Sequence, residues 1–427
     1  MKFTVITQGC KVNQYDSDTI AESMIRAGFS PAKEGEKPDI VIVNTCTVTE
    51  TSDKKGSRII SRLRRDYGES VIVVTGCYPQ AFAEEAAQNE NADIVTGNGG
   101  KHDIPRLVET FLKNREKNRE VKELTGEYPE PEEFSHSDMT RAYIKIEEGC
   151  NRFCSYCIIP VARGRVRSRS LSNIARETDF HARDGHKEIV LTGINLSCYG
   201  SDIGLSLADA VSTVAENPLI ERVRLSSLEP ELLTREMIGR LAETGKLCPH
   251  FHLSLQSGCT STLKRMNRHY TADEYRQIVT DLREFFPSCA ITTDIMVGFA
   301  GETEEEFAQS LKFAEEIGFA KIHVFTYSVR PGTAAAKMPN QVTEEEKSRR
   351  YKEMSRLAAE SRAKFHQKNI GKTYKVLIER QTCPEFIGGH TENYIPVRIY
   401  GGKAKRHDFV NVKITEAKED YCVGILV

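Results

Sequence analysis

Three cysteines in "EEGCNRFCSYCIIP", residues 147–160, carry the strongest chemical signal in this sequence. Cys150, Cys154 and Cys157 follow a C-x3-C-x2-C spacing, and soft thiolates select zinc or iron–sulfur clusters. A structural zinc site would be closed by a fourth Cys or His. The segment that follows, "IIPVARGRVRSRS", contains neither, so the spacing predicts a site with one ligand position left open.

An open position of this kind suits a four-iron cluster that binds a cosubstrate. Three thiolates leave one iron without a protein ligand, and that iron could chelate the amino and carboxylate groups of S-adenosylmethionine. Electron transfer into the bound sulfonium would then release a 5′-deoxyadenosyl radical, chemistry that belongs to the cofactor. The sequence therefore predicts radical chemistry at Cys150, Cys154 and Cys157.

A second set of cysteines follows three strand-like runs near the N-terminus. Cys10, Cys46 and Cys77 come directly after "KFTVIT", "DIVIVNT" and "SVIVVTG". Because the carboxyl ends of parallel strands share one edge of a sheet, where ligands bind, these cysteines are expected to meet at one metal site. The alternative is that each is a small buried residue at a strand end.

Four regions of the chain would position these cysteines. Residues 1–111 alternate strands with amphipathic helices, which predicts an open parallel α/β domain. Residues 112–139 are charged and then rich in Pro and Glu, as in a linker. Residues 140–369 contain six strand-like runs and a closing helix, which predicts a partial (β/α)6 barrel with its active site at the strands' carboxyl ends. Residues 370–427 read as a small antiparallel β-barrel of a kind that often binds oligonucleotides.

Composition places the chain among globular proteins with real cores. Of 427 residues, 39% are hydrophobic and 28% are charged, and the formal net charge is −2, so nucleic-acid binding would need local basic patches. No signal-peptide pattern begins the sequence, and no apolar run reaches the roughly 20 residues of a membrane span. We therefore expect a cytoplasmic protein, not a membrane protein, whose 12 cysteines stay reduced.

The cluster loop resembles the signature of radical S-adenosylmethionine enzymes. Across nearly its whole length the chain resembles the methylthiotransferases, which join a three-cysteine N-terminal domain, a radical barrel and a small C-terminal barrel called TRAM. The resemblance includes all six cysteines of the two triads. It implies two [4Fe-4S] clusters, of which the barrel cluster makes the radical and the N-terminal one carries sulfur to the substrate. The reaction would replace a C–H bond with C–S–CH3 and consume two S-adenosylmethionine molecules.

The other strand ends offer polar residues for the cosubstrate. Gly193 would let the backbone approach the methionine end, where Asn195 can donate and accept hydrogen bonds; an ordinary turn is the alternative. The resemblance implies that Ser254 and Gln256, which alternate with apolar residues in "HFHLSLQ", face the cosubstrate. His250 and His252 share that face and are read equally well as structural histidines.

Two carboxylates and one aromatic ring complete the predicted cosubstrate site. Glu229 and Asp294 are candidates for holding the ribose hydroxyls, although a helix cap or an ion pair would explain each acid equally well. By analogy with the family, Tyr156 in the cluster loop would pack near the adenine; loop packing is the alternative.

Basic residues in two places predict contact with RNA phosphates. Alternate arginines in "ARGRVRSRS" would line one face if the segment were extended, and a basic turn, "GGKAKRH", lies in the last region. The alternative is a solvated strand or loop. The predicted RNA-binding residues are Arg163, Arg165, Arg167, Arg169, Lys403, Lys405 and Arg406.

The family resemblance implies three possible substrates: isopentenyladenosine in tRNA, threonylcarbamoyladenosine in tRNA, and an aspartate of a ribosomal protein. The cluster loop and "RLSSLEP" look most like the threonylcarbamoyladenosine enzymes, which implies attack at carbon-2 of adenosine 37 in the tRNA anticodon stem-loop. An electron donor and a sulfur source would also be needed. A different class, a non-catalytic zinc protein that binds RNA, would explain the basic segments but not the missing fourth ligand.

Overall fold

The computed structural model describes residues 1–124, 126–379 and 383–427. The chain forms two compact units, each assembled from three stretches of sequence. Unit 1 comprises Met1–Ser137, Glu147–Arg169 and Ser328–Ala336, and unit 2 comprises Asp138–Ile146, Ser170–Tyr327 and Lys337–Val427. The loop with Cys150, Cys154 and Cys157 therefore belongs to the same compact unit as Cys10, Cys46 and Cys77, a grouping that the predicted divisions at 111 and 140 did not anticipate.

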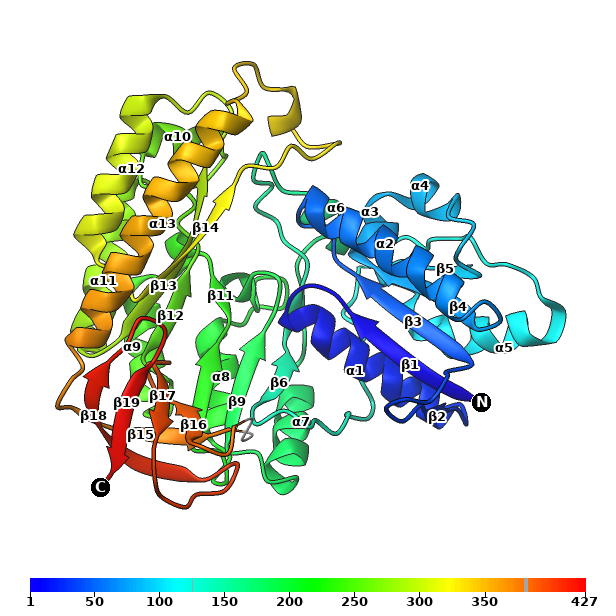
Figure 1. The fold of residues 1–427 in the computed structure, drawn as a ribbon, viewed down its shortest axis with the longest axis horizontal. Coiled ribbons are helices and arrows are strands. Elements are labelled where there is room, and N and C mark those ends of the chain that lie inside the picture. The colour runs from blue at the N-terminus through cyan, green and yellow to red at the C-terminus, as the bar shows by residue number, and fades with distance from the viewer. Residues whose placement is uncertain (125, 380–382) are drawn as a thin grey trace. The chain divides into compact units, whose positions relative to one another are not determined.

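Unit 1 contains a five-stranded parallel sheet in the order β2-β1-β3-β4-β5 (Figure 1). The central strands β3 and β4 are buried along their whole length, as expected for apolar strands covered on both faces. One face packs on α1 and α5, and the other on α2. The strands are β1 Lys2–Thr7, β2 Ser30–Pro31, β3 Ile40–Thr45, β4 Val71–Gly76 and β5 Ile94–Val95. The helices are α1 Lys11–Arg26, α2 Glu50–Asp66, α3 Cys77–Ala81, α4 Ala83–Ala87, the 3-10 helix Asn98–Asp103 and α5 Ile104–Asn114.

The cluster loop is closed by a short antiparallel pair. Strand β7, Glu147–Glu148, pairs with β8, Arg167–Ser168, and the loop between them contains the helix α6, Ile159–Arg163. The basic segment after the cysteines is therefore helical through Arg163 and extended only at β8. In the predicted linker, α5 continues to Asn114, and Asn118 then forms a bridge with Ile94.

Unit 2 contains the six predicted parallel strands. They hydrogen-bond in the orders β10-β9-β6 and β11-β12-β13-β14 because the predicted third strand is interrupted at Ser226. This arrangement confirms a partial, open parallel barrel. The strands are β6 Ala142–Lys145, β9 Glu188–Thr192, β10 Arg222–Leu225, β11 Ser227–Leu228, β12 His250–Leu253, β13 Ala290–Val297 and β14 Lys321–Thr326.

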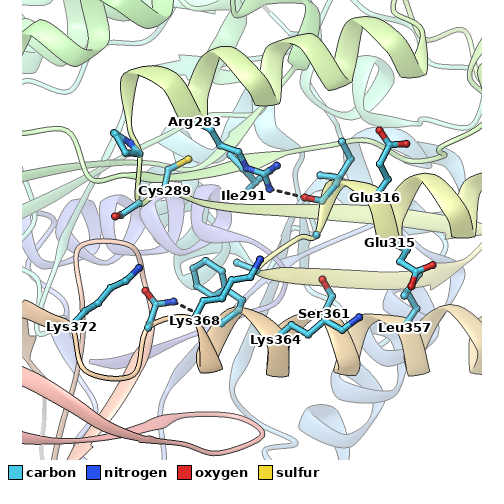
Figure 2. A pocket seen from close by; sticks show the side chains of 17 residues that line it. Arg283, Cys289, Ile291, Glu315, Glu316, Leu357, Ser361, Lys364, Lys368 and Lys372 are labelled. Carbon is cyan, nitrogen blue, oxygen red and sulfur yellow. Dashed lines mark hydrogen bonds between the residues drawn. The ribbon is translucent and has the colours of Figure 1, made fainter.

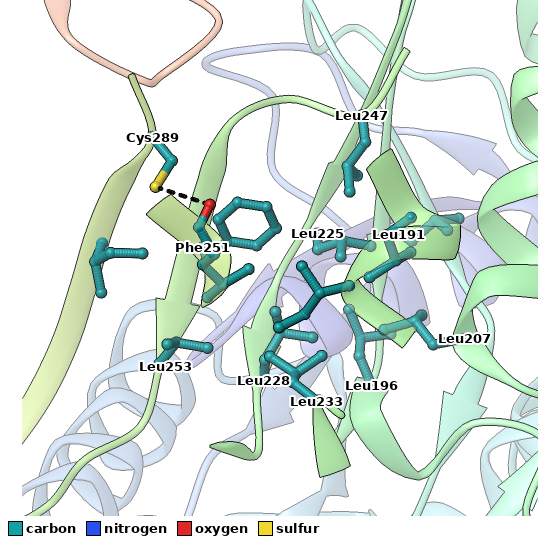
Figure 3. Packing of buried hydrophobic residues seen from close by; sticks show 14 of the residues in the cluster. Leu191, Leu196, Leu207, Leu225, Leu228, Leu233, Leu247, Phe251, Leu253 and Cys289 are labelled. Carbon is teal, nitrogen blue, oxygen red and sulfur yellow. Dashed lines mark hydrogen bonds between the residues drawn. The ribbon is translucent and has the colours of Figure 1, made fainter. Parts of the chain in front are cut away.

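Helices follow these strands, and the apolar side chains between the two layers form the main core. Capping boxes fix the starts of α11, at Thr271 and Glu274, and of α12, at Thr303 and Glu306. Figure 3 shows Leu191 from β9, Leu225 from β10 and Leu253 from β12 within this core. The helices are α7 Leu171–Arg183, α8 Leu207–Ala215, α9 Arg235–Glu243, α10 Thr260–Arg265, α11 Ala272–Phe285, α12 Glu304–Ile317 and α13 Glu344–Gln367.

A closed five-stranded barrel ends the chain, in the order β15-β16-β17-β19-β18. Its pairs are antiparallel except for β17 with β19, which confirms the predicted small antiparallel barrel. Strand β16 gives a weak signal in the sequence, because "IGGH" has two glycines in four residues. The strands are β15 Thr373–Ile378, β16 Ile387–His390, β17 Pro396–Ile399, β18 Phe409–Ala417 and β19 Cys422–Leu426.

Buried ion pairs join this terminal barrel to the amino end of the parallel sheet. Glu188, at the start of β9, accepts hydrogen bonds from Arg141 Nε and Arg224 Nε, each 2.7 Å long. Arg141 also pairs with Glu379 at 2.7 Å, and Arg224 donates to the Glu392 carbonyl at 3.1 Å. Burial alone would raise the pKa of Glu188, but the two guanidinium groups lower it to about 2.

Among the described residues, the structure contains no helix with the length and hydropathy that crossing a lipid bilayer requires.

Candidate functional site

The three N-terminal cysteines lie at the carboxyl ends of three neighbouring strands, as predicted. Cys10 is the N-cap of α1 just after β1, Cys46 follows β3 directly, and Cys77 begins α3 immediately after β4. The first two loops are in close contact, because a Cβ atom added to Gly9 would lie 3.1 Å from the Cys46 Sγ. The topology therefore brings the three thiols to one edge of the sheet.

The electrostatics of Cys46 show that the three sulfurs interact. The pKa of the Cys46 thiol is raised to about 11, mainly by burial and to a smaller extent by the neighbouring Cys77 and Cys10. Such a thiol stays protonated at neutral pH until a metal displaces the proton. The site therefore suits a strongly bound metal group better than a free reactive thiolate.

The donor set, three cysteine thiols, is one that iron–sulfur clusters use. Among the described residues, no three His, Cys, Asp or Glu side chains are close enough together to hold one metal ion. In a cubane cluster each thiolate binds a different iron, so the cysteines stand farther apart than ligands of one ion. A cluster on Cys10, Cys46 and Cys77 stays a prediction.

A buried arginine contacts one of these cysteines. Arg163, at the end of α6, is fully buried, and its Nε donates to the Cys77 Sγ at 3.2 Å. Its Nη1 pairs with Asp16 at 2.7 Å and also with Glu148, and its Nη2 donates to the Asn13 Oδ1. Every nitrogen of this guanidinium therefore has a partner within unit 1.

Three more buried polar residues complete this network. Lys101 lies 2.8 Å from Asp16. Asn98 Nδ2 donates to the Ala162 carbonyl at 2.8 Å and lies 3.7 Å from the Cys77 Sγ. Asn13 Nδ2 donates to two backbone carbonyls, those of Gln8 (2.6 Å) and Thr45 (3.0 Å), just before two of the cysteines.

Sequence reasoning missed this network. The available signal was the helix after Cys10, "KVNQYDSD", whose Asn13 and Asp16 are buried although an amphipathic helix normally exposes its polar residues.

The loop of Cys150, Cys154 and Cys157 is held at its base by backbone contacts. The Cys150 amide donates to the Gly164 carbonyl at 3.0 Å, and the Cys157 amide donates to the Cys154 carbonyl at 2.9 Å. All three cysteines are half-buried. Half-exposed thiols with no Cys or His fourth ligand nearby in the sequence fit a cluster with one open iron.

The structure corrects the predicted RNA contacts of three arginines in this segment. Arg163, Arg167 and Arg169 are buried, and their guanidinium groups are engaged inside unit 1. An alternating pattern suggested one exposed face, but the α6 helix and the short β8 strand turn these side chains inward. Arg165 alone of the four is exposed, and its guanidinium lies 4.3 Å from the Phe153 ring.

The second basic turn remains accessible in part. Lys403 and Lys405 are exposed, and their RNA contacts stay a prediction. Arg406 is half-buried; its Nε donates to Thr140 at 3.1 Å, and its Nη2 contacts the Asp138 carbonyl. Arg406 therefore has a structural role within unit 2.

The predicted cosubstrate residues of unit 2 lie along neighbouring strands or just after them. Gly193 and Asn195 follow β9. In the same loop, the Ser197 hydroxyl accepts a hydrogen bond from the Glu229 amide at 2.8 Å. The Ser254 amide donates to the Leu228 carbonyl at 3.2 Å. These hydrogen bonds bring the loops after β9, β11 and β12 together at the carboxyl edge.

The alternation predicted around β12 is confirmed. His252, Ser254 and Gln256 are half-buried, while the intervening apolar residues are fully buried. The Gln256 amide donates to the Asp294 carbonyl at 2.8 Å, and Gln256 has a left-handed backbone with φ of +68°. A strained non-glycine residue at this position favours a functional role for its side chain.

The two candidate carboxylates have partners inside the protein. Glu229 pairs with Arg268 at 2.5 Å, and Arg268 also donates to the Ser254 carbonyl at 2.7 Å. Asp294 accepts from His252 Nε2 at 3.1 Å. The structure therefore holds both acids in fixed positions, and their contact with ribose stays a prediction. Tyr156 is half-buried in the cluster loop of unit 1, and its packing against the adenine likewise stays a prediction.

A cavity of about 500 Å³ lies elsewhere in unit 2. It borders Cys289, which directly precedes β13, and Ala320, which directly precedes β14. The cavity is therefore at the amino ends of these strands. Figure 2 shows Lys364 from α13 and Lys368 just after it on one side, and Arg283, which donates to the Ile317 carbonyl at 2.6 Å, on the other. Because parallel barrels react at the carboxyl ends of their strands, this cavity is not the candidate active site.

Three known families match successive parts of the chain. Residues 2–97 match the uncharacterized protein family UPF0004, residues 144–314 the radical SAM superfamily, and residues 367–427 the TRAM domain. The threonylcarbamoyladenosine tRNA methylthiotransferase MtaB of Aquifex aeolicus is 36% identical over 94% of this chain and 98% of its own length. This chain belongs to the radical SAM methylthiotransferase family.

A second relative of this methylthiotransferase carries a different name. The tRNA-2-methylthio-N(6)-dimethylallyladenosine synthase of Pelotomaculum thermopropionicum is 34% identical over 100% of this chain and 97% of its own length. Among solved structures, the radical S-adenosylmethionine methyltransferase TsrM from Kitasatospora setae matches with a TM-score of 0.59 at 14% identity, covering 78% of this chain and 73% of that chain, which shows the fold alone. Family membership implies a [4Fe-4S] cluster and S-adenosylmethionine.

Proposed function

We propose that this methylthiotransferase converts threonylcarbamoyladenosine at position 37 of tRNA to its 2-methylthio derivative. The C2–H bond is replaced by C2–S–CH3, and two S-adenosylmethionine molecules are consumed. One structural observation carries the two-cluster part of this proposal: two cysteine triads belong to one compact unit. The choice of nucleoside is supported by the similarity to the MtaB of Aquifex aeolicus. A single-cluster radical enzyme has no use for the second triad.

The radical triad holds a [4Fe-4S] cluster on Cys150, Cys154 and Cys157. When bound, this cluster supplies the electron that cleaves S-adenosylmethionine. In unit 2, Asn195, Ser254 and Gln256 bind the cosubstrate by hydrogen bonds. Gly193 leaves room for its methionine end, and the Glu229 and Asp294 carboxylates accept from its ribose hydroxyls.

The second triad, Cys10, Cys46 and Cys77, holds the cluster from which sulfur is delivered. Cys46 and Cys77 are buried and exclude water from its protein-facing side, Cys10 is exposed, and the Arg163 network fixes Cys77. The sulfur itself comes from an external source, and an external donor supplies the electrons.

The terminal barrel binds the anticodon stem-loop. Tyr400 is 49% exposed, its ring lies 5.9 Å from that of Phe386, and the Arg398 guanidinium lies 4.6 Å from the Phe386 ring. Aromatic rings beside cations form the kind of platform on which unpaired bases stack. Lys403 and Lys405 line a pocket that Phe386 also borders, and they contact phosphates.

Iron and acid-labile sulfide analysis of anaerobically reconstituted protein tests the two-cluster proposal. We expect about eight of each per chain, since each cubane contains four. Cys46→Ala should retain about four and still cleave S-adenosylmethionine, whereas Cys154→Ala should retain about four and lose cleavage. A wild-type value near four would remove the case for a second cluster and for sulfur insertion.

The nucleoside itself is tested with tRNA. In a host that lacks methylthiotransferases, expression of the gene should add a methylthio group to threonylcarbamoyladenosine and leave isopentenyladenosine unmodified. The isopentenyladenosine enzyme is the second candidate because of the Pelotomaculum relative, and the reverse pattern would establish it. Modification of a ribosomal protein in place of tRNA would refute both assignments.

Lys403 and Lys405 provide a prediction for tRNA binding. Because each phosphate contact contributes roughly 0.7–0.9 to the slope of log affinity against log salt, replacing both lysines by Gln should lower the slope by about 1.5. Fluorescence anisotropy with an anticodon stem-loop at several salt concentrations measures this change. The exposed Lys352 and Lys337, replaced together by Gln, should leave the slope unchanged. Equal slopes in the two double variants would contradict the assignment.

A further inference from the structure

A buried guanidinium joins the segment that follows the radical triad to a cysteine of the other triad within unit 1. Arg163 lies six residues after Cys157, the last cysteine of the radical triad. Its Nε nevertheless donates to the Sγ of Cys77, which belongs to the other triad, at 3.2 Å. Asn98 supports the same junction, because its amide group holds the Ala162 carbonyl and lies near the Cys77 Sγ.

The surroundings of Arg163 fix both its position and its charge. Its Nη1 is held by Asp16 and Glu148, and Lys101 contacts the same two carboxylates at 2.8 Å and 3.6 Å. Two cations balance two carboxylates at this point, and Arg163 and both carboxylates are almost completely buried. Because so many anchors hold the guanidinium, its Nε–H is directed at the sulfur and cannot easily rotate away.

A donor aimed at a cysteine sulfur changes the properties of a cluster bound to that sulfur. Hydrogen bonds to the sulfurs and nearby positive charge stabilise the reduced, more negative state of an iron–sulfur cluster, and therefore raise its reduction potential. A buried guanidinium does so more effectively than an exposed one because solvent screens it less.

We propose that Arg163 is a positioning residue that holds the Cys77 sulfur and raises the reduction potential of the sulfur-delivering cluster. This inference rests on the proposed function, since it requires a cluster on Cys10, Cys46 and Cys77. It adds that the loop of the radical triad sets the redox properties of the second cluster through α6.

The test isolates one cluster. In full-length protein with Cys150, Cys154 and Cys157 replaced by Ala, only the N-terminal cluster can assemble, and its midpoint potential is measured by a redox titration followed by electron paramagnetic resonance. The potential does not depend on the fraction of chains that hold a cluster. Arg163→Gln should shift it to a more negative value, and Arg163→Lys should restore part of the shift because it returns a positive donor.

Arg169→Gln is the matched control. Arg169 is equally buried and lies six residues further along the same segment, but it contacts Tyr15 and the Phe134 ring. The Arg169→Gln variant should keep the midpoint potential of the background protein, in which Cys150, Cys154 and Cys157 are replaced by Ala. Equal potentials in the Arg163→Gln and Arg169→Gln proteins, whether shifted or not, would overturn the inference. If Arg163→Gln does not fold, the comparison of Arg163→Lys with Arg169→Lys decides in the same way. A background protein that assembles no cluster would instead refute the second cluster and the proposed function.

Discussion

Gln256 combines a strained backbone with a position in the candidate cosubstrate site. Its φ of +68° costs a non-glycine residue about 1–2 kcal/mol. We expect Gln256→Gly to raise the urea midpoint of unfolding and to weaken S-adenosylmethionine binding at least tenfold, measured by calorimetry. Asn267 has a similar φ of +57° outside the site, so Asn267→Gly should stabilise the protein without changing this affinity. Equal affinities in the two variants would remove Gln256 from the site.

The chemistry of single residues was predictable only where the spacing itself carries meaning. Six cysteines could be assigned to two triads because thiolate spacing and strand ends are visible in sequence. The partners of Arg163 could not be predicted, because Asn13 and Asp16 come from a distant helix and Glu148 from the far end of the cluster loop. The arginines after the cysteines were misread for a different, local reason. Alternation predicts one shared face only if the segment is a strand, and here α6 intervenes.

At the scale of elements, the cluster loop depends on one close backbone approach. Gly149 has φ of +89°, and a Cβ atom there would overlap the Arg165 carbonyl oxygen across the loop. Gly149→Ala should therefore disrupt the loop and halve the iron content, to about four per chain.

Gly204→Ala is the control for this prediction. Gly204 also has a positive φ, of +71°, but no atom lies within 4 Å of the added Cβ, so its variant should keep all its iron. Iron analysis together with circular dichroism separates loop disruption from global unfolding. Full iron content in Gly149→Ala would show that the loop tolerates the displacement.

The strands were predictable because buried parallel strands form continuous apolar runs, as β3 and β4 do. The interruption at Ser226 and the glycine-containing strand β16 could not be predicted, since each depends on the pairing of distant segments. The assignment of residues 147–169 to unit 1 was equally hidden, because it results from contacts with α1 and α3 and not from the local sequence.

For the molecule as a whole, the ion pairs of Glu188 contribute to stability in acid. The pKa of Glu188 is lowered from 4.5 to about 2 by Arg224 and Arg141, against the effect of burial. A lowered pKa in the folded state means that the stabilisation is complete above about pH 4.5 and is lost as the pH falls toward 2.

Glu188→Gln should therefore cost about 3–5 kcal/mol at neutral pH, because it leaves buried guanidinium groups without their counter-charge. The difference in urea midpoint from the wild type should narrow below pH 4.5. Glu360→Gln, which removes an exposed pair with Arg356, should change the midpoint little at any pH. A Glu188 effect that stays constant down to pH 3 would refute the pKa assignment.

The assembly of unit 1 from three stretches of chain has a consequence for proteolysis. A single cut after Ser137 would break the covalent link between residues 1–137 and the rest of the chain. The stretches 147–169 and 328–336 of the same unit would stay on the other fragment. Buried pairs such as Arg163 with Asp16, and Arg330 with Asp53 at 2.7 Å, would keep the two fragments bound. A nicked enzyme would thus remain one particle in gel filtration, and the sulfur-delivering part could not be shed by one cleavage.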